Sequence, residues 1–257
     1  MTEREWVGTQ IDTRGVALVT IRNAAKLNAL SIAVQQALIA AMAKVSANNQ
    51  VRVVVLRGEG DRAFIGGADL RDLFAINAGS AAAFITGVHL ACDAMRRCPV
   101  PVIARIQGYV LGAGLELAAA CDMRLASENA IFGMPEVKIG LPSVVEAALL
   151  PQLIGWGRTR QLLLTGDTIS AAKAMAWGLI EEMVPAAELD DAVETLVASI
   201  LDAGPKAVRL QKALIRQWEE LMPAAAIQAG ISCFARAFED DEPTRMIGHA
   251  LKRMQKK

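Results

Sequence analysis

Residues 108–122 read Gly-Tyr-Val-Leu-Gly-Ala-Gly-Leu-Glu-Leu-Ala-Ala-Ala-Cys-Asp. A short apolar strand, expected over Val100–Gln107, leads into the glycines, and strong helix formers follow them. The first amides of such a helix have no intrahelical partner and lie at the positive end of the helix dipole. Because Glu116 falls in the first turn, the stretch predicts free N–H groups beside a carboxylate, an arrangement that suits chemistry in which negative charge builds up on a carbonyl oxygen. The pattern alone also fits a buried strand, turn and helix with no chemical role.

A second glycine bend occurs at Gly66-Gly67-Ala68-Asp69. A strand ends there, the glycines permit close backbone approach, and a helix follows with Asp69 as its expected cap. Two such bends can offer two converging amides, and an oxyanion pocket needs two donors about 3 Å from one oxygen. The second bend therefore strengthens the prediction of such a pocket.

A second carboxylate, Glu136, stands in the constrained loop Gly133-Met134-Pro135-Glu136. Paired carboxylates in apolar surroundings tend to have pKa values that are pushed apart, so that one serves as acid and the other as base. Glu116 and Glu136 are the expected pair. The alternative for each is a glutamate that caps a helix or forms a salt bridge.

Composition narrows the class of protein. The chain has 257 residues, a formal net charge of zero, few aromatics and four cysteines. Zero net charge offers no basic excess for nucleic acid, and the cysteines form no C-x-x-C pair or zinc spacing. No run of about 18 apolar residues is present, and the charged N-terminus differs from a signal peptide. We expect a cytoplasmic protein with reduced cysteines, no bound metal and no membrane segment.

Strand and helix patterns alternate up to about Val145, and helical patterns dominate after it, so we expect an α/β core followed by a helical subdomain. The expected strands are Val16–Ile21, Val51–Leu56, Val100–Ile106 and Met123–Ala126, with short extended pieces at Ala130–Met134 and Val137–Gly140. The expected helices are Ser31–Ala47, Ser80–Arg97, Val145–Leu150, Thr159–Leu164, Ala171–Trp177, Glu188–Ala203, Lys206–Leu221, Ala224–Phe238 and Pro243–Met254.

Three ordered motifs give the chain a family resemblance: Ala63–Leu70, Gly108–Asp122 and Phe132–Glu136. In order and spacing they resemble the enoyl-CoA hydratase/isomerase (crotonase) superfamily, and the similarity runs from about Val16 to Val184. The resemblance implies a crotonase-like spiral of ββα turns with an acyl-CoA site over residues 1–190. It also implies a C-terminal helical trimerisation subdomain over residues 191–257, and a homotrimer or a dimer of trimers (a homohexamer).

The resemblance also implies a reaction. The thioester oxygen of an enoyl-CoA would accept hydrogen bonds from the backbone N–H groups of Ala68 and Ala113. Glu116 and Glu136 would hold a water over the β-carbon, and Glu136 would deliver a proton to the α-carbon to give a 3-hydroxyacyl-CoA. No redox cofactor is needed, because acyl-CoA is the substrate.

Substrate contacts carried over by position surround these groups. Besides the catalytic residues they comprise Lys26, Ala29, Gly66, Gly67, Asp69, Leu70, Gly112 and Pro135. Lys26 is expected near a phosphate of CoA, with a solvated surface lysine as the alternative. A basic side chain near Lys252–Lys257 is a second candidate, for the 3′-phosphate.

One segment departs from the hydratase pattern. Where hydratases keep glycines after a proline, this chain reads Gly140-Leu-Pro-Ser-Val-Val-Glu-Ala-Ala148 and adds a third carboxylate, Glu146. Glu146 either faces a polar acyl group in the pocket or pairs with an arginine such as Arg158 or Arg160. This segment leaves the acyl group, and with it the reaction, open.

Several other functions therefore remain. A double-bond isomerase, a decarboxylase and an acyl-CoA hydrolase are alternatives on the same fold, and isomerases often manage with one carboxylate. A non-catalytic homologue that binds RNA or a protein is a further alternative, against which the neutral charge argues. His89 and His249 are each expected to pack or to lie on the surface rather than to catalyse.

Overall fold

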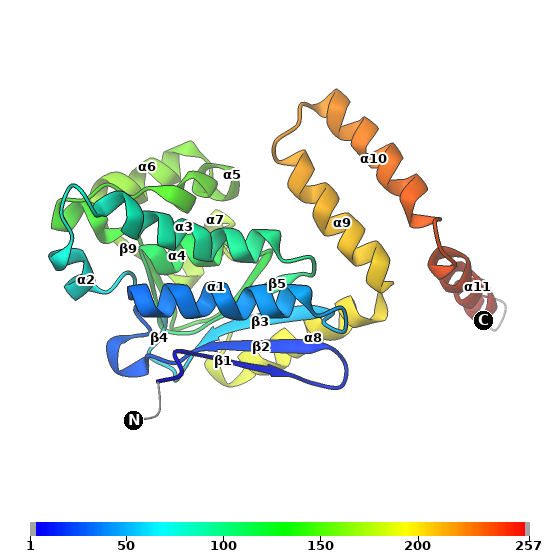
Figure 1. Ribbon diagram of the computed structural model, residues 1–257, viewed down its shortest axis with the longest axis horizontal. Coiled ribbons are helices and arrows are strands. Elements are labelled where there is room, and N and C mark those ends of the chain that lie inside the picture. Colours follow the sequence, from blue (N-terminus) through cyan, green and yellow to red (C-terminus); the bar gives the residue numbers. More distant parts are fainter. Residues whose placement is uncertain (1–3, 255–257) are drawn as a thin grey trace.

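The computed structural model describes residues 4–254, and its chain passes repeatedly between two sheets (Figure 1). Residues 1–3 and 255–257 lie outside the described residues, and with them Lys256 and Lys257, two of the candidates for contact with the 3′-phosphate. The larger sheet has the order β1 (Val7–Ile11), β2 (Val16–Ile21), β3 (Val53–Gly58), β5 (Val102–Ile106), β7 (Met123–Ser127) and β10 (Glu182–Val184). The smaller sheet has the order β4 (Ala63–Ile65), β6 (Tyr109–Leu111), β8 (Ile131–Gly133) and β9 (Thr168–Ser170).

Each turn of the chain adds one strand to each sheet. β3, β5 and β7 pair in parallel in the larger sheet, and the strands that follow them, β4, β6 and β8, pair in parallel in the smaller one. Among the strands of the described residues, only the outer strands β1 and β9 run antiparallel to their neighbours. A helix follows most of these strand pairs, so the predicted spiral of ββα turns is confirmed.

Helices lie on both faces of the larger sheet, with α8 on one face and α1 and α3 on the other. In chain order the helices are α1 (Ile32–Ala47), α2 (Leu70–Ala75), α3 (Ala81–Arg97), α4 (Ala113–Ala120), α5 (Leu150–Ile154), α6 (Trp156–Thr165), α7 (Ala171–Trp177), α8 (Leu189–Asp202), α9 (Pro205–Trp218), α10 (Pro223–Ala237) and α11 (Glu242–Met254). The described part of the chain also has the 3₁₀ helices η1 (Ala24–Lys26), η2 (Pro135–Ile139), η3 (Val145–Leu149) and η4 (Ala186–Glu188). None of the helices within residues 4–254 is long and apolar enough to cross a membrane.

Two apolar cores follow from the alternating faces of the strands. The larger core joins the sheets to α1, α3 and α4. On the opposite face, Val53, Ile103 and Leu125 of the sheet pack against Val193 and Val197 of α8. Because α8 completes this second core, the predicted boundary between residues 190 and 191 falls inside a helix that packs on the sheet.

The remaining C-terminal helices project away from this body (Figure 1). α9 packs against α10, and α10 buries none of its residues. Its Ile227, Ile231 and Phe234 are 63%, 59% and 71% exposed. The predicted helical C-terminus is therefore present, and it carries an apolar face that this chain alone leaves uncovered.

Two expectations about local structure were wrong or incomplete. Val137–Gly140 is not extended but belongs to η2, because Pro135 fixes φ at the start of that turn and Gly140 (φ +80°) ends it in the left-handed region. Strands β1, β6, β9 and β10 were not predicted, since segments of three to five residues are too short to show a clear period of two.

Candidate active site

A mostly apolar cavity of about 320 Å³ opens where three segments distant in the sequence meet. The glycine bend after β4, the glycine bend before α4 and the loop around η2 all contribute to its wall. Its lining residues are Gly66, Gly67, Ala68, Leu70, Leu73, Phe84, Ile85, Val88, Leu111, Gly112, Ala113, Glu116, Pro135, Glu136, Lys138, Ile139, Leu141, Pro142, Ser143 and Val144. The predicted site residues 66–68, 70, 112, 113, 116, 135 and 136 thus share one cavity.

The two glycine bends lie against each other because β4 and β6 are neighbouring parallel strands. Gly67 has φ +110°, and a Cβ there would lie 3.2 Å from the carbonyl oxygen of Leu111. Gly112 has φ +50° and ψ −121°, which is backbone that residues with a Cβ rarely adopt. A Cβ on Gly114 would overlap the carbonyl oxygen of Ile65. Glycine is therefore required on both sides of this contact.

The amides of Ala68 and Ala113 lie at the edges of these bends. Leu30 N–H donates to Gly67 O (2.8 Å), and Asp69 N–H donates to Leu30 O (3.4 Å). Neither of these hydrogen bonds involves the N–H of Ala68, which lies between them in the sequence. Ala113 is the first residue of α4, where the N–H precedes the intrahelical ladder. Both residues line the cavity, so its wall offers two backbone donors that form no backbone hydrogen bond within residues 4–254.

Glu116 is held in the first turn of α4 with 4% of its surface exposed. Burial and, next, the charge of Glu136 raise the pKa of Glu116 to about 8. The N–H of Ala147 donates to Glu116 Oε1 at 3.3 Å and acts in the opposite direction. The raised pKa means that Glu116 carries a proton at neutral pH.

Glu136 reaches the same cavity from the first turn of η2. Ser143 Oγ donates to its Oε2 at 2.8 Å. Its Oε1 lies so close to Gly112 that a Cβ on that residue would collide with it. The predicted pair of carboxylates is therefore brought together, and its position depends on the glycine bend.

Lys26, Ala29 and Asp69 do not line the cavity but lie behind the 66–68 bend. Lys26 Nζ is 2.7 Å from Asp69 Oδ2, and this contact, more than any other, lowers the pKa of Asp69. Asp69 Oδ1 also accepts from the N–H of Arg71 at 2.9 Å, so the predicted cap of α2 is confirmed. Gly66 N–H donates to Leu27 O at 2.7 Å, which ties the 26–30 segment to the bend.

Glu146 also lies outside the cavity wall, and its expected arginine partner was wrong. Its Oε1 is 2.8 Å from Nδ1 of His89, whereas Arg158 donates to the carbonyl oxygen of Trp177. The reason is the direction of η3, which turns the glutamate towards α3 rather than towards α6. The departure from the glycine-rich pattern does change the wall, because Val144 lines it.

Sequence reasoning did not single out Ser143 and gave His89 no partner. The only local signal for Ser143 was its place in the segment where the expected glycines are missing. His89 has a half-exposed side chain on α3, and its contact with Glu146 spans 57 residues of sequence. No local pattern encodes such a distant pairing.

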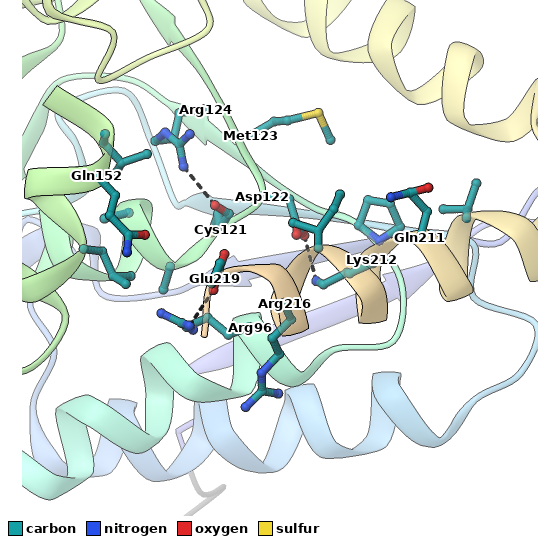
Figure 2. A pocket seen from close by; sticks show the side chains of 17 residues that line it. Arg96, Cys121, Asp122, Met123, Arg124, Gln152, Gln211, Lys212, Arg216 and Glu219 are labelled. Carbon is teal, nitrogen blue, oxygen red and sulfur yellow. Dashed lines mark hydrogen bonds and ion pairs between the residues drawn. The ribbon is translucent and has the colours of Figure 1, made fainter. Parts of the chain in front are cut away.

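A second cavity of about 400 Å³ lies between α9 and the end of α4, and neither Glu116 nor Glu136 lines it (Figure 2). Four of its charged groups form two pairs: Lys212 Nζ is 2.7 Å from Asp122 Oδ2, and Arg96 Nη2 is 2.7 Å from Glu219 Oε2 (Figure 2). Lys212 also donates to the carbonyl oxygens of Met95 (3.1 Å) and Val100 (2.9 Å). These contacts attach α9 to the body.

Comparison with known proteins places this fold and site in a class. The enoyl-CoA hydratase of Mycobacterium smegmatis superimposes with a TM-score of 0.94 at 29% identity, over 97% of both chains. The enoyl-CoA hydratase of Bacillus anthracis gives a TM-score of 0.93 at 28% identity, over 96% of both chains. The fold is therefore the crotonase fold.

The sequence defines the family more narrowly. The family model described as enoyl-CoA hydratase/isomerase matches residues 12–253. A putative enoyl-CoA hydratase/isomerase of Bacillus subtilis, YngF, is 32% identical over 94% of this chain and 92% of the relative. A crotonyl-CoA hydratase of Syntrophomonas wolfei is 37% identical over 77% of this chain and 76% of the relative. The chain belongs to the enoyl-CoA hydratase/isomerase family.

Proposed function

We propose that the protein is an enoyl-CoA hydratase that adds water across the 2,3 double bond of an enoyl-CoA thioester. The observation that carries this proposal is the presence of two carboxylates, Glu116 and Glu136, on one small apolar cavity beside two unused backbone donors. Relatives named short-chain-enoyl-CoA hydratase and crotonyl-CoA hydratase support it. The product is a 3-hydroxyacyl-CoA.

In this reaction the thioester oxygen accepts hydrogen bonds from Ala68 N–H and Ala113 N–H. These donors stabilise the enolate that forms when the hydroxyl adds to the β-carbon, and each such donor is worth about 2.7–4 kcal/mol. The small side chains at both positions leave the backbone accessible. The apolar wall strengthens these hydrogen bonds because it excludes water.

Glu116 and Glu136 together hold the reacting water and one proton. The carboxylate of the pair takes a proton from the water as its oxygen joins the β-carbon, and the carboxylic acid gives its proton to the α-carbon. The pair therefore ends with the single proton it began with. The raised pKa of Glu116 makes that carboxyl the resting place of the proton. For Glu136 to be the donor to the α-carbon, this proton passes from Glu116 to Glu136 when substrate and water bind, and Glu116 is then the carboxylate that takes the proton of the water.

Hydration of crotonyl-CoA is the test, followed as loss of the absorbance of the conjugated thioester. Glu116→Gln and Glu136→Gln should each lower kcat by about 10²–10⁴-fold, as expected for a general acid or base. Exchange of the α-proton in heavy water should be lost more completely in Glu136→Gln. An enzyme that hydrates no enoyl-CoA but moves the double bond of a 3-enoyl-CoA would be an isomerase instead.

The CoA moiety is proposed to run past the 26–30 segment, which is tied to the Ala68 bend. Lys26 is the candidate for a phosphate contact, although Asp69 already partly neutralises it. Lys26→Met should raise KM with little change in kcat. An unchanged KM would remove Lys26 from the site.

We also propose that the chain assembles as a homotrimer or a dimer of trimers through its C-terminal helices. The uncovered apolar face of α10 supports this assembly. Sedimentation equilibrium of the full chain should give three or six times the mass of one chain. A monomer at micromolar concentration would refute it.

A further inference from the structure

Glu146 is buried at a cost that its own contacts do not explain. Its side chain is 6% exposed, its Oε1 is 2.8 Å from His89 Nδ1, and its buried Oε2 has no hydrogen-bond partner within the described residues. A buried carboxylate with an unsatisfied oxygen is unfavourable, and a purely apolar side chain at such a position is often as stable or more so. The burial therefore points to a role beyond stability.

The backbone next to Glu146 carries the donors that contact Glu116. Ala147 N–H donates to Glu116 Oε1 at 3.3 Å. The backbone N–H of Val144 also lowers the pKa of Glu116, and Val144 lines the cavity. Between them Val145 has φ +39°, a left-handed value that a β-branched residue adopts only when surrounding contacts hold it there. The contact from Glu146 to His89 on α3 is one such contact.

We propose that Glu146 is a positioning residue for Glu116: its contact with His89 fixes the 144–147 turn so that the N–H groups of Val144 and Ala147 point at the Glu116 carboxyl. The inference rests on the proposed role of Glu116 in hydration. Glu146 does not touch the substrate in this arrangement. It acts through the backbone of its own turn.

The charged and titratable groups around Glu116 and Glu146 predict in which direction the pKa of Glu116 changes when Glu146 is replaced. Glu116 faces Glu136 from η2 and Glu146 from η3, and Cys92 on α3 lies near both Glu116 and Glu146. The charge of Glu146 raises the pKa of Glu116, and the hydrogen bond from Ala147 lowers it by more. Loss of the turn together with the charge therefore raises the pKa of Glu116, whereas loss of the charge alone lowers it.

The experiment compares Glu146→Leu with Glu146→Gln. Leucine fills the volume but loses the contact with His89, whereas glutamine keeps an oxygen for that contact and loses only the charge. The carboxyl of Glu116 is titrated by ¹³C NMR of protein labelled at the glutamate side-chain carboxyl carbon, with Glu116→Gln to assign the signal. We expect the pKa of Glu116 to rise above about 8 in Glu146→Leu and to fall below it in Glu146→Gln.

Turnover should follow the same order. A displacement of about 1 Å in a catalytic group costs about 10²-fold, so kcat should fall by that order in Glu146→Leu and less in Glu146→Gln, with KM little changed. His89→Ala should also lower kcat. The double variant Glu146→Leu/His89→Ala should be no slower than Glu146→Leu, because both changes break one contact.

Three results would overturn the proposal. A lower or unchanged pKa of Glu116 in Glu146→Leu would show that Glu146 does not hold the donors in place. If the losses of kcat in Glu146→Leu and His89→Ala multiply in the double variant, the two side chains act independently of each other. If Glu146→Leu does not fold, an unchanged kcat in His89→Ala decides against it. The NMR titration needs no turnover, so a wild-type chain that hydrates no enoyl-CoA would refute the proposed function and leave this test intact.

Discussion

Glu116 should make the stability of the protein fall as the pH rises. Its pKa is about 8 in the folded chain against 4.5 for an ordinary glutamate. Between these values the unfolded chain has lost the proton while the folded chain keeps it. Unfolding then releases a proton, so a higher pH favours the unfolded state. The stabilising contribution is complete below about pH 4.5 and is lost as the pH approaches 8.

The size of the effect follows from the two pKa values. Each pKa unit corresponds to about 1.4 kcal/mol, so the rise from 4.5 to about 8 corresponds to roughly 5 kcal/mol over the whole window. Glu116→Gln has no proton to lose. The free energy of unfolding of the variant minus that of the wild type should therefore grow with pH, by up to about 1.4 kcal/mol per pH unit.

Urea unfolding at a series of pH values from 5 to 8, at one fixed protein concentration, measures this difference. The concentration must be fixed because assembly of subunits would add to the apparent stability. Glu128→Gln is the matched control, since Glu128 is exposed and lies away from the cavity. A difference between wild type and Glu116→Gln that stays constant over this range, as the control should, would refute the argument that burial of Glu116 raises its pKa.

Three further substitutions test contacts at the site, at α9 and at the start of α2. Gly112→Ala should lower kcat by about 10²-fold or more, because its Cβ collides with Glu136 Oε1, and the positive φ should cost about 1–3 kcal/mol in the free energy of unfolding. Lys212→Met should cost about 3 kcal/mol in urea unfolding, since it removes the ammonium group from Asp122 and from two carbonyl groups and leaves Asp122 only the N–H of Val102 as a donor. Asp69→Ala should cost about 1 kcal/mol through loss of the α2 cap and should speed hydrogen exchange in α2.

Each of these expectations has a contrary result. Wild-type kcat in Gly112→Ala would show that Glu136 moves freely without loss of function. A loss below 1 kcal/mol in Lys212→Met would show that apolar contacts, not the buried ammonium group, attach α9. Unchanged exchange in α2 after Asp69→Ala would show that the helix does not depend on its cap.

Local elements could be predicted from the sequence where the residues of one short segment determine its conformation. Ser31 caps α1, with its Oγ accepting from Val34 N–H at 3.3 Å, and α7 spans Ala171–Trp177 as its sequence indicates. Gly112 allows the sharp turn into α4. These features depend on φ and ψ preferences and on hydrogen bonds within one turn, so neighbouring residues suffice to determine them.

The site was predictable in its residues but not in its distances. The glycine bends and the two glutamates could be named from motifs, because glycine and carboxylate have distinct chemistry at those positions. The amino-acid pattern alone could not show that the bends touch, since that depends on the parallel pairing of β4 with β6. The wrong expectation for Val137–Gly140 had a similar origin, because a 3₁₀ turn and an extended piece have similar composition.

The sequence by itself determined the caps, the glycine turns, the alternation of strands with helices and the helical C-terminus. Only the tertiary structure decided that Glu116 and Glu136 share one cavity, that Glu146 meets His89, and that Asp122 meets Lys212. The physical reason is the distance along the chain over which each interaction acts. Backbone preferences act over a few residues, whereas burial, pKa and ion pairing depend on which distant segments the folded chain brings together.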